Sequence, residues 1–325
     1  MPALRVEAPG LLTTVQDLGR LGYERFGVPP SGPLDEFALR AANALVGNGP
    51  EAAALELGLD GVQLTADADC LVAVTGAGQG LAVRINGRVR PLWTALYLRG
   101  RQTVEVAKQP GGWAYLAVRG GVDVPLVMGS RATYLRGGFG GLAGRALREG
   151  DRLLVGPPPG RRDPAEMAGR RLPPEQRPAY PEPGQAADVR VVLGPQRAHF
   201  TDETVARFLE AEYVVTPEAD RMGCRLSGPA LIPQPADLIS EAMPVGAIQA
   251  PAGGAPIVML ADRPTTGGYP KIAVVARADV ALVAQSPPGL GRLRFRAVPV
   301  AEAQARYRAQ LARLGRIEED HDPGT

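Results

Sequence analysis

Short stretches in which apolar and polar residues alternate make up most of the chain, and glycines or prolines separate them. A period of two is typical of strands with one buried face, and Gly and Pro are typical of the turns between strands. The pattern predicts strands at residues 4–7, 12–16, 53–59, 70–75, 82–85, 88–90, 103–107, 113–119, 152–155, 188–193, 213–216, 256–261, 272–276 and 293–298. Asn86-Gly87 predicts a tight hairpin turn between two of these strands.

Helical spacing of apolar residues is confined to a few segments. It predicts a helix over residues 34–46, with Pro33 in its first turn and a stop at Gly47. A second helix is expected near residues 202–210 with Thr201 as its N-cap, and a third from residue 301 to about 314. The third helix is expected to turn Ala305, Leu311 and Leu314 toward the body. The sequence therefore predicts a mainly β protein with a few helices.

Residues 156–185 differ from the rest of the chain, because Pro, Arg, Gly and Glu dominate them and large apolar residues are few. Such composition is typical of a boundary or a long excursion. We predict an N-terminal β-rich half over residues 1–160, a linker or excursion over 161–186, and a C-terminal β-rich half with the terminal helix over 187–325.

Composition narrows the class of protein. The 325 residues carry a formal net charge of +2 and only 5% aromatic residues, which disfavours a nucleic-acid surface or a polybasic membrane patch. Two cysteines and two histidines are too few for a Cys-only zinc site or a three-histidine site, so no metal site is predicted. Without a signal-like start or a long apolar stretch, a cytoplasmic protein is the expectation.

The sequence contains no complete nucleotide-binding motif. Neither Lys108 nor Lys271 follows a glycine, so no P-loop of the usual kind exists. Gly76-Ala77-Gly78 follows a predicted strand but leads into a hairpin instead of a helix, and the glycines at 138 and 140 follow no strand. Both clusters are interpreted as tight turns. We expect this chain to bind no cofactor by itself.

The segment from Asp262 to Lys271 is the richest in polar groups, and it lies between two predicted strands. Glycines let backbone N–H groups approach an anion, and a desolvated lysine can act as a base, which an arginine cannot. Lys271 is also one of only two lysines in a chain that otherwise uses arginine. Lys108, in the turn over residues 108–111, is the matched control for any substitution of Lys271. The alternative is a rigid polar hairpin with no chemistry.

Two further polar groups qualify as binding sites. One comprises residues 13–20 and 28–35, where a rigid proline-containing loop leads into the first predicted helix. Helix capping alone would also explain its Ser31 and Asp35. The other is a turn around Arg221, whose guanidinium could clamp a carboxylate or pair with Asp220.

We therefore predict Asp262 and Lys271 as catalytic residues. The predicted substrate-binding residues are Thr14, Gln16, Asp17, Arg20, Ser31, Asp35, Asn43, Arg221, Gln249, Thr265, Thr266 and Tyr269.

Taken together, these segments resemble one family, which includes the C subunit of 5-oxoprolinase, the KipI antagonist KipA, allophanate hydrolase subunit 2 and the carboxyltransferase region of urea carboxylase. The similar stretches are residues 9–20, 27–29, 31–35, 42–43, 46–48, 55–56, 75–77, 115–118, 129–131, 221–223, 246–249 and 262–271. They span nearly the whole chain, up to about residue 295.

The resemblance implies two cyclophilin-like β-barrel-type units packed together. It also implies ATP-dependent opening of 5-oxoproline to glutamate, by a complex with homologues of the KipI-like B subunit and of the A subunit. ATP and Mg²⁺ would be used by the assembled complex. Neither lysine is flanked by methionine, so a biotin carrier of the Met-Lys-Met kind would have to be another protein.

Three functions remain open at this point, because the motifs are common to all of them. The chain could be one component of an ATP-dependent amidohydrolase acting on 5-oxoproline. It could be a regulatory protein that sequesters a KipI-like kinase inhibitor. It could also be half of a biotin-dependent carboxyltransferase for a urea-like substrate. Polar density at residues 262–271 favours chemistry over sequestration.

Overall fold

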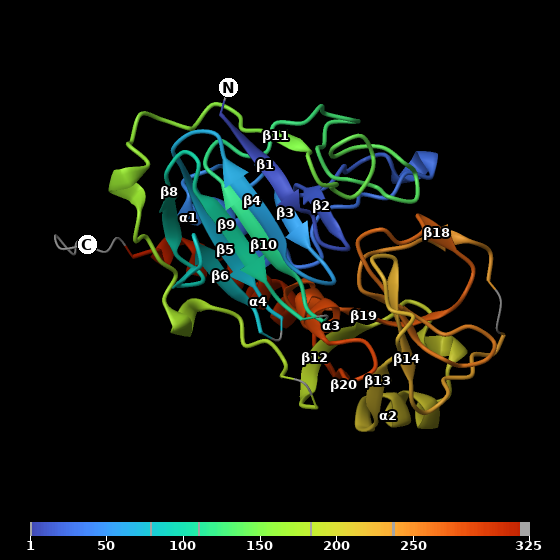
Figure 1. The fold of residues 1–325 in the computed structure, drawn as a ribbon. Helices are drawn as coiled ribbons and strands as arrows, with labels where there is room; N and C mark the ends of the chain where they lie inside the picture. The colour runs from blue at the N-terminus through green and yellow to red at the C-terminus, as the bar shows by residue number, and fades with distance from the viewer. Residues whose placement is uncertain (1, 79, 110, 183, 236–237, 319–325) are drawn as a thin grey trace. The chain divides into compact units, whose positions relative to one another are not determined.

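The computed structural model describes residues 2–78, 80–109, 111–182, 184–235 and 238–318. The chain divides into two compact units (Figure 1). The first comprises residues 1–20, 31–178 and 311–325, and the second comprises residues 21–30 and 179–310. The units interleave along the chain, whereas the sequence predicted two contiguous halves with a linker between them.

Two antiparallel sheets form the first unit. One sheet has the order β11 (Arg152–Leu154), β1 (Ala3–Ala8), β4 (Val62–Ala66), β9 (Thr103–Ala107), β6 (Ala82–Ile85) and β7 (Arg88–Arg90). The other has the order β2 (Thr13–Gln16), β3 (Ala54–Leu57), β10 (Ala114–Val118), β5 (Cys70–Gly76) and β8 (Ala95–Leu98). The predicted hairpin is confirmed, because Asn86 and Gly87 both have positive φ between β6 and β7.

The hydrophobic core of the first unit lies between its two sheets. Leu4 and Val6 of β1 pack in one cluster with Val72 and Val74 of β5. Residues between them on β1, such as Arg5, point to solvent, which is the alternation that made the strand predictable.

Helix α1 (Glu36–Leu45) covers the other face of β5 and β10, so these strands are buried on both faces. Asp35 caps the helix by accepting a hydrogen bond from the N–H of Ala38 at 2.9 Å. Thr75 of β5 donates to the carbonyl of Ala38 at 2.7 Å and ties the sheet to the helix. The predicted helix is therefore confirmed.

A closed seven-stranded barrel forms the second unit, and it confirms the predicted mainly β, barrel-type fold (Figure 1). Its order is β12 (Ala186–Leu193), β19 (Lys271–Val275), β16 (Ala247–Gln249), β17 (Ile257–Met259), β14 (Gly223–Ser227), β13 (Glu212–Val215) and β20 (Arg292–Ala297). Parallel pairing of β12 with β20 closes it, and the other pairs are antiparallel.

Short elements surround the barrel. Helix α2 (Asp202–Glu210) packs on β20, and stacked Phe208 and Phe295 join the two. The predicted cap is confirmed, because Thr201 accepts from the N–H of Thr204 at 3.1 Å. Helix α3 (Val280–Gln285) packs on β12. A separate two-stranded ribbon pairs β15 (Glu241–Ala242) with β18 (Thr266–Gly267).

The terminal helix, α4 (Val300–Ala312), continues into a 3-10 turn over Arg313–Arg316. Its predicted inner face is wrong in part, because Ala305 is exposed and Ala303 is the buried residue of the helix. Leu311 and Leu314 are half-buried. Among the described residues, no helix has the length and apolar character that a membrane span requires.

Candidate functional site

The predicted site residues divide between the two units. Thr14, Gln16, Asp17, Arg20, Ser31, Asp35 and Asn43 belong to the first unit. Arg221, Gln249, Asp262, Thr265, Thr266, Tyr269 and Lys271 belong to the second.

Asp17 anchors a loop in the first unit. Its Oδ1 accepts from the hydroxyl of Ser130 at 2.6 Å and from the N–H of Gly19 at 2.9 Å, and its Oδ2 accepts from the N–H of Arg131. Gln16 donates to Thr14 at 3.1 Å and to the Thr133 carbonyl at 3.2 Å. The bonds to Ser130, Arg131 and Thr133 join the turn after β2 to residues more than a hundred positions away, so their evident role is structural.

Arg20 completes the same loop. Its side chain is 1% exposed, donates from Nη2 to the carbonyl of Ala132, and lies 5.0 Å from the centroid of the Phe139 ring. A guanidinium fixed between a carbonyl and an aromatic face is buried by the fold.

A second polar cluster surrounds the start of α1. Tyr115 donates to Oε2 of Glu56 at 2.7 Å, and that oxygen also accepts from the N–H of Leu34 at 2.9 Å. Burial, followed by the charges of Glu56 and Asp35, raises the pKa of Tyr115 well above its usual range. The phenol therefore stays protonated, and it accepts a bond from the N–H of Asp35 at 2.8 Å.

Asn43 and Ser31 flank this cluster. Asn43 donates to the carbonyl of Ala52 at 2.7 Å and accepts from Asn48 at 3.0 Å, so it holds the end of α1. Ser31 has a φ of 55° and a buried hydroxyl with no hydrogen-bond partner among the described residues. The capping alternative therefore applies to Asp35 but not to Ser31.

In the second unit, Arg221 and Asp262 form a buried ion pair. The guanidinium donates from Nε to Oδ2 at 2.8 Å and from Nη2 to Oδ1 at 3.3 Å, and each side chain is 6% exposed. Of the two alternatives for Arg221, the pairing with Asp220 is wrong, because the carboxylate that it holds is that of Asp262. Asp220 instead accepts from the N–H groups of Met222 and Gly223, and strand β14 begins where the sequence predicted only a turn.

Lys271 lies at the end of the barrel where β12 and β16 finish and β19 begins. Its Nζ donates to Oε1 of Glu241 at 2.9 Å, and its backbone N–H donates to Gln196 at 3.4 Å. Gln196 in turn donates to Oε1 of Glu241. We call Gln196, Glu241, Gln249 and Lys271 the barrel-end cluster.

The ribbon of β15 and β18 covers the barrel-end cluster. A Cβ at Gly267 would lie 2.7 Å from Nε2 of Gln249, so the absence of a side chain lets the ribbon approach. Gln249 donates to the carbonyl of Tyr269 at 3.5 Å. The side chains of Thr266 and Tyr269 are exposed, and Thr265 is half-buried and accepts from the N–H of Met243 through its carbonyl.

Asp262 and Lys271 thus have different partners, although the sequence placed them in one loop. Lys271 is 3% exposed, while its partner Glu241 is 45% exposed. A buried ammonium beside a solvent-facing carboxylate can stabilise negative charge on a carbonyl oxygen while the carboxylate takes up a proton. Sequence reasoning missed Glu241 and Gln196, because only the fold brings residues 196, 241 and 271 together.

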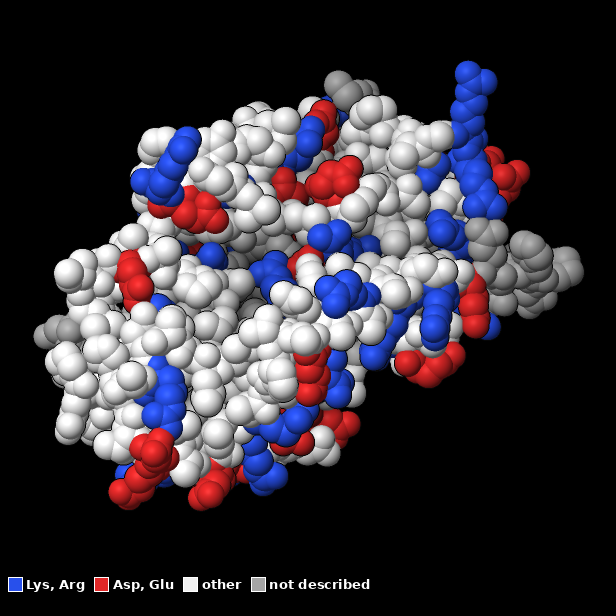
Figure 2. Space-filling model, turned by 180° about the vertical axis from the view of Figure 1, so that it is seen from behind, with Lys and Arg blue, Asp and Glu red and all other residues white. Residues whose placement is uncertain are grey.

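Surface charge adds little to this assignment. On the face drawn in Figure 2, basic and acidic side chains are interspersed, and no broad field of one sign covers it. The described residues contain no group of three His, Cys, Asp or Glu that could hold a metal ion.

Comparison with known proteins identifies the family. Residues 26–297 match the carboxyltransferase domain, subdomain A and B, and the chain belongs to this family. It is 37% identical over 319 residues to the C subunit of 5-oxoprolinase from Escherichia coli, covering 95% of this chain and 97% of that one. The C subunit from Haemophilus influenzae is 34% identical, with 89% of each chain covered.

Larger enzymes contain a region that is similar to nearly the whole of this chain. The urea amidolyase of Lachancea kluyveri is 34% identical over 94% of this chain but only 17% of its own. The crystal structure of the Kluyveromyces lactis urea amidolyase superposes with a TM-score of 0.88 at 30% identity, covering 98% of this chain and 20% of that one. The resemblance inferred from the sequence motifs is therefore confirmed at the level of the family.

Proposed function

We propose that this chain is the C subunit of an ATP-dependent 5-oxoprolinase, which opens 5-oxoproline to glutamate in the cytoplasm. One observation carries the proposal: the chain matches the C subunit of the Escherichia coli enzyme nearly from end to end in both sequences. Its partners would be homologues of the KipI-like B subunit and of the A subunit. ATP and Mg²⁺ would act in the assembled complex.

The barrel-end cluster supplies groups suited to opening a cyclic amide. Lys271 would stabilise the negative charge that develops on the ring carbonyl oxygen when water adds to its carbon. Glu241 would accept the proton of that water and return it to the ring nitrogen as the C–N bond breaks. The products of the ring opening are the carboxylate and amino group of glutamate.

Reconstitution of the three subunits tests the proposal. Glutamate release from 5-oxoproline with Mg-ATP is expected from the complete mixture, and omission of this chain should abolish it. Full activity of the other two subunits alone would contradict the proposal.

A second candidate is a carboxyltransferase for a urea-like amide, which the similarity to urea amidolyase favours. Both lysines are buried, at 8% and 3% exposed, so a biotin carrier would have to be another protein. Carboxylation of urea by this chain with a biotin-loaded carrier, and no glutamate from the reconstituted complex, would favour this candidate.

The isolated chain is expected to bind ATP no more tightly than about 1 mM, a free energy of about −4 kcal/mol, because its sequence has no P-loop. Isothermal titration with Mg-ATP measures this. Micromolar binding by the pure chain would place the nucleotide site in this protein instead of its partners.

A further inference from the structure

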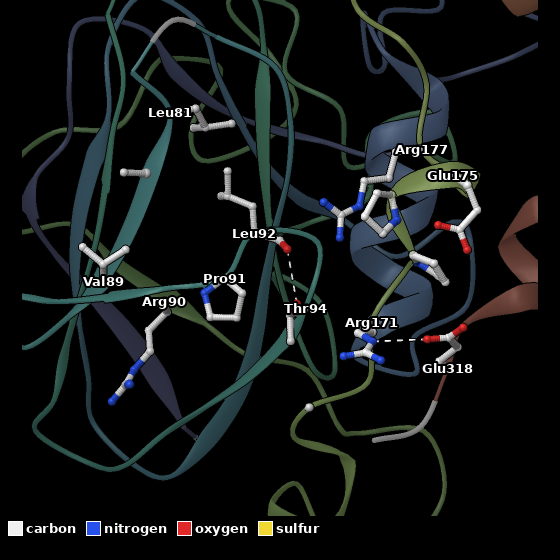
Figure 3. A pocket seen from close by; sticks show the side chains of 14 residues that line it. Leu81, Val89, Arg90, Pro91, Leu92, Thr94, Arg171, Glu175, Arg177 and Glu318 are labelled. Atoms are coloured by element: carbon white, nitrogen blue, oxygen red, sulfur yellow. Dashed lines mark hydrogen bonds and ion pairs between the residues drawn. The ribbon is translucent and has the colours of Figure 1, made fainter. Parts of the chain in front are cut away.

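A pocket of about 810 Å³ opens in the first unit, and none of the predicted site residues lines it (Figure 3). One wall consists of the β6–β7 hairpin and the segment over residues 91–94 that follows it. The other consists of the irregular segment from Gly169 to Arg177, together with Glu318. Its volume is in the range of sites that hold small organic molecules.

The backbone of the second wall is fixed. The N–H of Arg171 donates to the carbonyl of Glu318 at 2.9 Å, and the N–H of Leu172 donates to the carbonyl of Trp93 at 3.0 Å. Arg171 also forms isolated bridges with both Thr94 and Glu318. The pocket is therefore preformed, which lowers the entropy lost when a ligand binds.

The two walls differ in chemistry. Leu81, Val89, Pro91 and Leu92 make the first wall apolar, and Val89 is 66% exposed. Arginine side chains from the second wall face it, and Figure 3 shows the guanidinium of Arg177 directed toward Leu92. The second wall also carries Glu175 and Glu318, and the first wall carries Arg90, so the described lining has three arginines and two glutamates. A molecule in this pocket would therefore meet apolar surface on one side and a small excess of positive charge.

The guanidinium of Arg177 has hydrogen-bond donors that a ligand can use. Its Nε donates to the carbonyl of Leu172 at 2.8 Å, and its guanidinium carbon lies 5.9 Å from the centroid of the Trp93 ring. Among the residues that the structure describes, none accepts from its two Nη groups. The side chain is half-buried, and burial lowers the pKa of Arg177. The charge of Glu175 opposes this shift, and the charge of Arg171 adds to it.

Arg171 provides the second charge. Its Nε pairs with Glu318 at 3.2 Å, and both side chains are about half exposed, at 46% and 51%. A ligand carboxylate in this pocket would gain charge-assisted hydrogen bonds, chiefly from the two Nη groups of Arg177, with the charge of Arg171 nearby. We propose that this pocket is a binding site for a small organic anion, in which Arg171 and Arg177 hold the carboxylate and the wall of Leu81, Val89 and Leu92 holds an apolar body.

Three probes test the proposal on the full chain by isothermal titration. Benzoate carries both a carboxylate and an apolar ring. Benzamide is its neutral counterpart, and inorganic phosphate is an anion without an apolar body. Saturable binding of benzoate near 1 mM is expected, with benzamide and phosphate at least about tenfold weaker. Equal binding of benzamide would overturn the anion site, and equal binding of phosphate would overturn the apolar wall. Absence of benzoate binding up to about 20 mM would overturn both.

Substitutions of the lining residues test whether benzoate binds in this pocket. Arg171→Gln and Val89→Asp change exposed side chains, so both should fold, and each should weaken benzoate binding at least about tenfold. Arg148→Gln removes an equal charge from an exposed position outside the pocket and should leave binding unchanged. Arg177→Gln also removes the bond to Leu172, so Arg171→Gln decides the matter if that protein does not fold. Binding that is insensitive to both Arg171→Gln and Val89→Asp would overturn the assignment.

Discussion

The two lysines of this chain lie in contrasting surroundings, one in each unit. Lys108 is 8% exposed and donates to the backbone carbonyl of Gly58 at 2.5 Å, and burial lowers its pKa to about 8. Lys271 is equally buried, but it pairs with Glu241, whose carboxylate reaches solvent. A lysine bonded to the backbone is part of the fold, whereas a lysine bonded to an exposed side chain can exchange that partner for a substrate.

The same contrast separates the polar groups of the two units. Asp17, Asp35 and Asn43 in the first unit bond mainly to backbone groups. In the second unit, the ion pairs of Asp262 and Lys271 join side chains. Polar residues that look alike in sequence therefore differ in the nature of their partners, and of these pairs only that of Lys271 includes a carboxylate that reaches solvent.

The largest effect on stability is expected from Asp262→Asn. The change removes the carboxylate that pairs with the buried Arg221 guanidinium, and breaking a buried ion pair typically lowers the free energy of unfolding by about 3–5 kcal/mol. Urea unfolding followed by circular dichroism measures it. Recovery of part of that loss in the double variant Asp262→Leu, Arg221→Met is the control. A change under about 1 kcal/mol would contradict a stabilising role and favour the predicted catalytic role of Asp262.

Lys108→Met should show an intermediate effect that depends on pH. The unfolded chain keeps the Lys108 proton up to its ordinary pKa of 10.5, while the folded protein loses it near 8. Between these values the unfolded state binds more protons, so the wild type gains stability with rising pH. Between pH 8 and 10.5, the free energy of unfolding of the wild type should therefore rise by about 1–3 kcal/mol relative to that of Lys108→Met. A constant difference across this range would show that Lys108 keeps an ordinary pKa.

Glu241→Gln should have the smallest effect on stability. Glu241 is about half exposed, and glutamine keeps an oxygen that can accept a hydrogen bond from Lys271, so the loss of stability should be smaller than that of Asp262→Asn. Turnover of the reconstituted complex should nevertheless fall by about 100-fold or more if Glu241 transfers the proton. Thermal unfolding and glutamate release measure the two quantities. Unchanged turnover would confine Glu241 to a structural role.

Elements with a local signal were predictable from the sequence. The Asn86-Gly87 hairpin and the Thr201 cap each depend on residues within a few positions, and α2 and most strands lie where their periodicity placed them. Strand β16 has only three residues, and β14 begins at a glycine beside arginines, so neither shows a clear alternation.

The site was predictable only in part, because its pairs are distant in the chain. Arg221 and Asp262 are 41 positions apart, and Glu241 and Lys271 are 30 apart. Polar density identified the segment that carries Lys271. Only the closure of the barrel and the pairing of β15 with β18 decide which carboxylate the lysine meets.

Turnover of Lys271→Met beside Lys108→Met in the reconstituted complex tests the central claim most directly. Each variant removes one of the two buried amines. Comparing them separates the loss of the Lys271 amine at the proposed site from the general effect of removing a buried lysine. Lys271→Met is expected to lower glutamate release by about 100- to 10,000-fold with folding and assembly retained, while Lys108→Met should keep the activity of the wild type. More than about half of the activity in Lys271→Met would contradict the claim and leave the barrel-end cluster a structural feature.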